Sequence, residues 1–138
     1  MTKYQIANIV FSKFSRDYAE LKKDLPIRPS EMAVLNIITQ RDGLFTPLMI
    51  AELLGVSKSM VTAHISVLEE KEYIYKESSG DDKRSFYVMS TDKAKELVHT
   101  AEEKLNQHLK QIEAELGEDR FALLIELLGE AQAVIGQK

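Results

Sequence analysis

The chain has 138 residues, of which 44% are hydrophobic and 29% charged, a composition typical of one folded domain rather than of a disordered or membrane-spanning chain. It contains no cysteine, which excludes disulfides, thiolate zinc sites and thiol redox sensing. The net charge of -4 argues against a protein that coats nucleic acid without sequence preference, because such proteins carry an excess of Lys and Arg.

The N-terminal part of the chain has the pattern of two amphipathic helices. Apolar residues recur at helical spacing over residues 4–25, which predicts a helix that Pro26 ends. A second helix is expected to begin near Pro29 and to end before Asp42-Gly43. The sequence does not indicate which residue caps this second helix.

Two shorter helices follow, joined across a glycine. Thr46-Pro47 is typical of an N-cap followed by the first helical residue, and Gly55 is expected to end that helix. Ser57 is expected to cap the next helix. A glycine that permits the turn, with apolar residues that hold the helices at a steep angle, predicts a helix-turn-helix. The apolar stripe of its second helix consists of Val61, Ile65 and Leu68.

A β-hairpin and further helices complete the chain. Residues 73–77 and 85–90 are rich in aromatic and β-branched residues, and the segment between them has turn composition, so a hairpin is predicted. Thr91-Asp92 is expected to start a long helix that ends at Gly117, and a last helix follows it. The long helices at both ends of the chain must bury their apolar stripes, and pairing with a second copy is the simplest solution. We infer a homodimer.

The second helix of the predicted helix-turn-helix carries small, mostly hydroxylated residues opposite its apolar stripe. A major groove about 12 Å wide admits a helix with such side chains, and hydroxyl groups can form hydrogen bonds with phosphates and base edges. An N-cap role for Ser57, with the other residues on a solvated face, is the alternative, and the hairpin that follows makes it less favoured. The expected DNA-binding residues of this helix are Ser57, Lys58, Ser59, Thr62, Ala63 and Ser66.

The stretch "LLGVSKSMVTAHISVLEEKEYIYKESSGDDKRSFYVMSTDKA" resembles the MarR family of transcription regulators. The resemblance runs from the helix-turn-helix through a D-x-R tip to a Thr-initiated long helix, and the flanking helices extend it over the whole chain. It implies a mainly α fold with a small β-hairpin wing (α+β), in which flanking N- and C-terminal helices form a dimerisation bundle. The implied parts of this one intertwined domain are a dimerisation helix (1–28), a winged helix-turn-helix lobe (29–90) and C-terminal dimerisation helices (91–138).

By this resemblance the protein is a homodimeric, sequence-specific regulator, expected to be a repressor, that binds a pseudo-palindromic operator in double-stranded DNA. The recognition helix, residues 57–71, would enter the major groove, and the wing, residues 78–84, the minor groove. Arg84 would insert there and Asp82 would hold its guanidinium through an ion pair, with Lys83 between them. An ordinary surface ion pair is the alternative for Asp82 and Arg84, and a winged helix used for protein–protein interaction is the alternative for the module.

The chain departs from the family pattern at several positions. Glu72 stands where a glycine commonly ends the recognition helix, and a left-handed conformation there would cost about 1 kcal/mol, so the sequence leaves open whether the helix ends differently and shifts the wing. Ala94 replaces the usual glycine after the wing. His64 stands where an aliphatic residue is frequent, and a half-buried packing role is favoured over DNA contact. Residues 57–84 hold five cations against six carboxylates, so weak nonspecific binding is expected.

No cofactor is expected, and a small-molecule effector is left open. Many relatives bind one in a crevice between the dimerisation helices and the DNA-binding lobe. The residues that could line such a crevice are equally well explained as core, so the ligand-binding residues stay unassigned. They are Phe11, Phe14, Tyr18, Met32, Leu35 and Ile38.

Other classes of function are disfavoured. His99 and His108 do not have the spacing of a metal site on a helix, and none is expected. The carboxylates accompany no nucleophile or phosphate-binding loop, so the protein is not expected to be an enzyme. The apolar run at residues 6–11 is interrupted by Asn8 and lacks a cleavage site, so neither a signal peptide nor a membrane span is predicted and a cytoplasmic location is expected.

Overall fold

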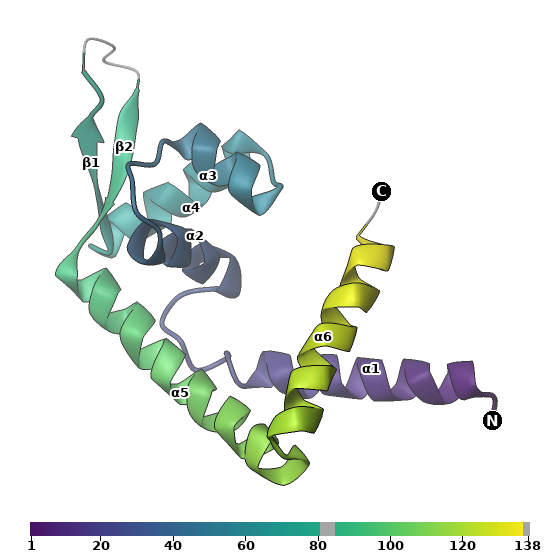
Figure 1. Ribbon diagram of the computed structural model, residues 1–138. Helices are drawn as coiled ribbons and strands as arrows, with labels where there is room; N and C mark the ends of the chain where they lie inside the picture. The colour runs from purple at the N-terminus through teal and green to yellow at the C-terminus, as the bar shows by residue number, and fades with distance from the viewer. Residues whose placement is uncertain (81–84, 137–138) are drawn as a thin grey trace. The chain divides into compact units, whose positions relative to one another are not determined.

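The computed structural model describes residues 1–80 and 85–136 (Figure 1). This part of the chain contains helices and one antiparallel hairpin, which confirms the predicted mainly α fold with a small β-hairpin. The chain divides into two compact units, Met1–Ala101 and Glu102–Lys138. The elements are α1 (Lys3–Glu20), α2 (Pro29–Gln40), α3 (Pro47–Leu54), α4 (Lys58–Glu70), β1 (Ile74–Ser78), β2 (Phe86–Ser90), α5 (Asp92–Leu116) and α6 (Glu118–Ile135).

Helix α1 ends earlier than its apolar pattern predicted. It begins with a capping box, in which Thr2 Oγ1 accepts the backbone N–H of Gln5 at 3.1 Å and Gln5 Oε1 accepts that of Thr2 at 2.8 Å. Its last helical residue is Glu20, and the backbone then tightens into turns closed by hydrogen bonds over three residues. The chain therefore leaves the helix before Pro26 forces it to do so.

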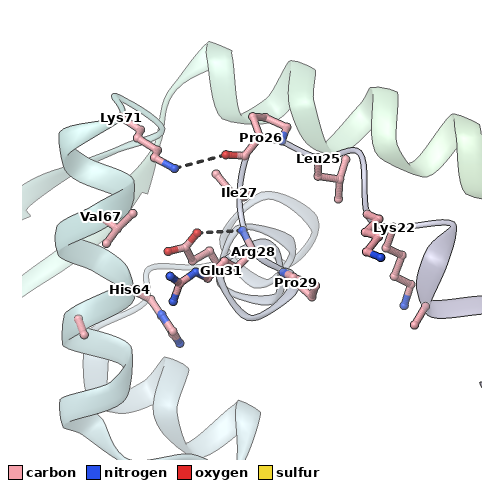
Figure 2. A pocket seen from close by; sticks show the side chains of 13 residues that line it. Lys22, Leu25, Pro26, Ile27, Arg28, Pro29, Glu31, His64, Val67 and Lys71 are labelled. Carbon is pink, nitrogen blue, oxygen red and sulfur yellow. Dashed lines mark hydrogen bonds between the residues drawn. The ribbon is translucent and has the colours of Figure 1, made fainter. Parts of the chain in front are cut away.

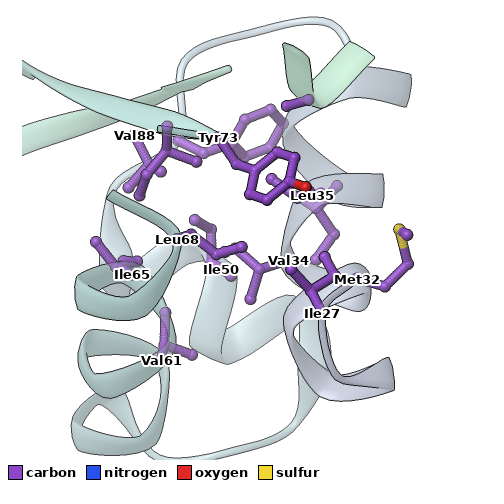
Figure 3. Close-up of a cluster of buried hydrophobic side chains, with 14 of the residues drawn as sticks. Ile27, Met32, Val34, Leu35, Ile50, Val61, Ile65, Leu68, Tyr73 and Val88 are labelled. Carbon is purple, nitrogen blue, oxygen red and sulfur yellow. The ribbon is translucent and has the colours of Figure 1, made fainter. Parts of the chain in front are cut away.

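The first unit is built around one apolar core (Figure 3). The predicted stripe of α4 is fully buried, and it packs with residues of α2, α3 and β2. Helices α3 and α4 are bent by 115° at the break between them, within the range of a helix-turn-helix. The largest fully buried side chains are Leu35, Ile50, Ile65, Leu68, Val34, Val61 and Val88.

The helix starts of this module are capped as the sequence predicted. Thr46 Oγ1 accepts the backbone N–H of Met49, and Ser57 Oγ accepts that of Met60, both at 3.2 Å. Gly55 ends α3 with φ of 69°, a left-handed conformation that glycine adopts without a Cβ clash. The cap that the sequence left open precedes α2, where the backbone N–H of Arg28 donates to Glu31 Oε1 at 2.9 Å.

The backbone at the end of α4, which the sequence left open, is left-handed at Glu72. Glu72 has φ of 66°, and it is the one non-glycine residue with positive φ in the described part of the chain. The N–H of Tyr73 donates to the carbonyl of Leu68 at 2.9 Å, and that of Glu72 to Glu69 at 3.0 Å. This is a Schellman motif, in which the buried Tyr73 and Leu68 supply the apolar contact. Burial of Tyr73 offsets the strain at Glu72.

Thr91 attaches the start of α5 to the end of α4. Its hydroxyl lies within hydrogen-bond distance of the carbonyls of Glu72 and Tyr73, at 2.9 and 3.0 Å. The backbone N–H of Thr91 also donates to Tyr73, and the N–H of Ala94 donates to Thr91 Oγ1 at 3.2 Å. Thr91 is thus the predicted N-cap of α5, and Ala94 is completely buried beside it.

The hairpin pairs Ile74 with Ser90 at its base and Ser78 with Phe86 near its tip. The backbone N–H of Val88 donates to the carbonyl of Phe45 at 2.8 Å, which fastens β2 to the segment before α3. The hairpin extends from this anchor past the helices of its unit (Figure 1).

The second unit contains the rest of α5 and α6, joined at Gly117 with φ of 86°. The predicted end of α5 is confirmed, because the N–H of Gly117 donates to the carbonyl of Glu113 at 2.7 Å. The carbonyl of Gly117 in turn accepts the N–H of Phe121. None of the described residues of this unit is buried.

Candidate nucleic-acid interface

The structure exposes the outer face of α4 and its N-cap. The side chains that the sequence nominated for DNA contact lie opposite the buried stripe of Val61, Ile65 and Leu68. A helix with this division of faces can approach a duplex without disturbing its own packing. That these residues contact DNA stays a prediction. The exposed positions are Ser57, Lys58, Ser59, Thr62, Ala63 and Ser66.

The hydroxyl groups on this face are already used in part by the helix. Thr62 Oγ1 donates to the carbonyl of Lys58 at 2.9 Å, and Ser66 Oγ donates to that of Thr62 at 3.1 Å. Each hydroxyl has one proton, so the oxygen lone pairs remain for a ligand. In a major groove, such acceptors match the amino groups of cytosine and adenine. The sequence alone had left both the donor and the acceptor role open.

The N-terminal end of the face is organised by Ser57. Its oxygen accepts the N–H of Met60 and lies 3.2 Å from Ser59 Oγ, so the two hydroxyls share one hydrogen bond. The N-cap role that the sequence offered as an alternative for Ser57 is therefore real. An N-cap and a phosphate contact are compatible, since the first turn of a helix presents free backbone N–H groups to an anion.

Asp82, Lys83 and Arg84 lie outside the described residues, and their assigned roles stay predictions. The strands that lead to the tip are described up to Ser78 and again from Phe86.

A crevice of about 500 Å³ separates the outer face of α4 from the hairpin. Helix α4 contributes the exposed side chains of Lys58, Thr62 and Ser66 to its wall, and the hairpin contributes Lys76 and Phe86. Lys76 was not among the nominated residues. Strand periodicity could have found it, because Lys76 stands two positions after the buried Ile74 and opposite the buried Val88, on the face of the hairpin that meets the core.

A second pocket, of about 590 Å³, borders the other flank of α4 (Figure 2). The half-buried side chain of His64 points into it, as expected for a packing histidine at the edge of the core. Lys71 Nζ donates to the carbonyl of Pro26 at 3.3 Å and so joins α4 to the segment that follows α1. Basic side chains outnumber acidic ones around this pocket. They are Lys22, Lys23, Arg28 and Lys71, against Glu31.

The apolar residues considered for an effector crevice do not line this pocket. Met32 and Leu35 are buried in the core, whereas Phe11 and Phe14 are exposed on α1. Ala63, which was nominated for DNA contact, lines this pocket. No local pattern in the sequence indicates this site, because its wall joins residues far apart along the chain.

The described residues contain no group of three or more His, Asp or Glu arranged to hold a metal ion. In the same part of the chain, no single helix has the length and apolar character to cross a membrane. Helices α3 and α4 taken together as one broken segment meet those two criteria, on length and composition alone.

Residues 25–85 match the model of the MarR family. A search of curated protein sequences finds no match. Among solved structures, the transcriptional regulator Tm0710 of Thermotoga maritima is 25% identical with a TM-score of 0.62, and the alignment covers 98% of this chain and 96% of that one.

Two further structures are similar over nearly the whole chain. FabT of Streptococcus pneumoniae, solved in complex with DNA, is 20% identical with a TM-score of 0.82 and 98% coverage of both chains. Apo MarR of Escherichia coli is 23% identical with a TM-score of 0.70, covering 95% of this chain and 97% of that one. At these identities the likeness shows a shared winged-helix fold.

Proposed function

We propose that this chain is a sequence-specific DNA-binding transcription regulator of the MarR type that works as a homodimer and represses its target genes. One observation carries this proposal: the outer face of α4 is exposed and hydroxyl-bearing while its inner face is fully buried. Regulation of transcription is the function that we propose, and no enzymatic activity is part of it.

In the proposed complex, α4 lies in the major groove and residues 78–84 of the wing reach the adjacent minor groove. The fold supports this arrangement, because the hairpin is anchored to the helix-turn-helix by the bond from Val88 to Phe45 and extends beyond it. Arg84 is the residue that we expect to enter the minor groove, with Asp82 holding its guanidinium. FabT, which shares the fold, was solved bound to DNA.

The homodimer is supported by the apolar residues that the terminal helices expose. Helices α1 and α6 each bury no residue completely, which is costly for amphipathic helices without a partner. A twofold dimer would present two recognition helices about 34 Å apart to a pseudo-palindromic operator. The exposed apolar residues are Tyr4, Ile6, Ile9, Val10, Phe11 and Phe14 of α1, and Leu123, Ile125, Leu127, Leu128, Val134 and Ile135 of α6.

We further propose that a small-molecule effector releases the DNA by binding the pocket of Figure 2. That pocket is lined by Ala63, His64 and Val67 of α4, so an occupant would contact the helix that we propose enters the major groove. Its excess of basic side chains favours an anionic ligand. A regulator of this kind works beside the chromosome, in the cytoplasm.

Selection of bound sites from random double-stranded DNA tests the proposed function. The expected result is an enriched inverted repeat whose half-sites are centred about one helical turn apart, as a twofold reader requires. Enrichment of a single half-site would contradict the dimer. No enrichment at any salt concentration would contradict sequence-specific DNA binding and favour a winged helix used for protein–protein interaction.

A further inference from the structure

The grooves that the proposed complex occupies are separated by one sugar-phosphate strand. A helix in the major groove and a hairpin in the adjacent minor groove must therefore lie on either side of that strand. On this protein the space between the two elements is the crevice of about 500 Å³ between α4 and the hairpin. The strand has to pass over this crevice, so its wall is where a phosphate would be met.

The crevice has the chemistry of a phosphate site. Cationic side chains enter it from both sides, Lys58 from α4 and Lys76 from β1. The described residues that line it include no carboxylate. Its hydroxyl groups come from Thr46, Thr62, Ser66 and Ser85.

Lys76 is held in this crevice by contacts on two sides. Its ammonium lies 4.8 Å from the centre of the Phe86 ring, across the hairpin. Its Nζ also lies 3.6 Å from Glu69 Oε1 on α4, just outside the lining. The two side chains of this ion pair remain 42% and 43% exposed, so water screens the pair and a phosphate can replace the carboxylate.

We propose that Lys76 binds a phosphate of the DNA strand between the two grooves, and that Glu69 holds the same ammonium in the free protein and so competes with DNA for it. This inference rests on the proposed function. It adds a backbone contact to the complex and assigns Glu69 an opposing role. Because a phosphate carries no sequence information, Lys76 sets affinity and salt dependence, whereas the outer face of α4 sets sequence preference.

Replacement of Lys76 by Gln tests the phosphate contact. The control is Lys95→Gln, which also removes one positive charge but lies on the exposed face of α5. Binding of operator DNA is titrated from 50 to 200 mM salt. One phosphate contact makes the affinity fall by about threefold over this range of salt. The factor by which the affinity of the Lys76→Gln variant falls should therefore be about threefold smaller than the factor for the parent. Its preference for operator over unrelated DNA should stay at the parental ratio.

Replacement of Glu69 by Gln tests the competition. We expect tighter operator binding, and a larger gain than for Glu70→Gln, which removes the neighbouring carboxylate without touching the ion pair. If Glu69 acts by holding Lys76, its extra gain disappears when both Glu69 and Lys76 are replaced by Gln. Persistence of the full gain in the double variant would overturn the role given to Glu69.

A Lys76→Gln variant with the same salt dependence as Lys95→Gln would overturn the phosphate contact. Failure of this inference can be told from failure of the proposed function by Thr62→Glu. If Thr62→Glu abolishes operator binding while Lys76→Gln behaves as Lys95→Gln does, only the inference is wrong. If Thr62→Glu binds operator as the parent does, the outer face of α4 does not enter the major groove. The proposed function itself is wrong if the parent protein enriches no site from random DNA.

Discussion

Glu72 adopts a left-handed backbone conformation, φ 66°, at the end of the recognition helix. A Cβ costs about 1 kcal/mol in that region, whereas glycine has none. We expect Glu72→Gly to raise the free energy of unfolding by about that amount, measured by urea denaturation. Glu70→Gly, within α4, is the control and should lower it, because glycine weakens a helix. A less stable Glu72→Gly protein would contradict this interpretation.

Thr62 lies at the middle of the exposed face of α4, where a longer, charged side chain fits without disturbing the core. We expect Thr62→Glu to abolish specific operator binding, because it places a carboxylate among DNA phosphates and lengthens a side chain that must fit the groove. A gel-shift titration measures the effect, and circular dichroism checks that the helix remains. Thr100→Glu adds the same charge on an exposed position of α5, and it should weaken binding far less.

At the scale of elements, the junction of α4, β1 and α5 depends on Thr91. Its hydroxyl caps α5 and also meets the carbonyls of Glu72 and Tyr73. We expect Thr91→Ala to lower the free energy of unfolding by about 1 to 2 kcal/mol, since a lost N-cap costs that much and the two carbonyls lose a donor. Thermal unfolding measures the change. Thr91→Ser keeps the hydroxyl and should restore most of the stability, and an equal loss in both variants would contradict the capping role.

Element boundaries show what local pattern can and cannot predict. Thr46, Ser57 and Thr91 act as the predicted N-caps, because capping involves only the next few residues. The sequence left the end of α4 open, since its conformation at Glu72 depends on burial of Tyr73 in a core built from distant segments. Local preference at one residue gave way to tertiary packing.

At the scale of the whole molecule, the proposed homodimer would bury the exposed apolar face of α1. Phe11 is 59% exposed in the single chain, so a charge there is tolerated by a monomer but not at a dimer interface. We expect Phe11→Glu to raise the dimer dissociation constant at least tenfold, or about 1.4 kcal/mol, and to weaken operator binding in parallel. Sedimentation velocity over a range of concentrations measures the assembly. Ser12→Glu, on the polar side of the same helix, should leave the protein dimeric. Equal dissociation constants for the two variants would exclude α1 from the interface.

The sequence by itself determined the order of the elements, most of their caps, the buried stripe of α4 and the family resemblance. These properties depend on residues within a few positions of one another, or on helical and strand periodicity, which the sequence displays directly. Only the tertiary structure decided that Lys76 faces Glu69, that a cationic pocket borders the recognition helix, and that Glu72 takes a left-handed conformation. Each of these depends on contacts between segments that folding brings together, and no local pattern in the chain specifies such contacts.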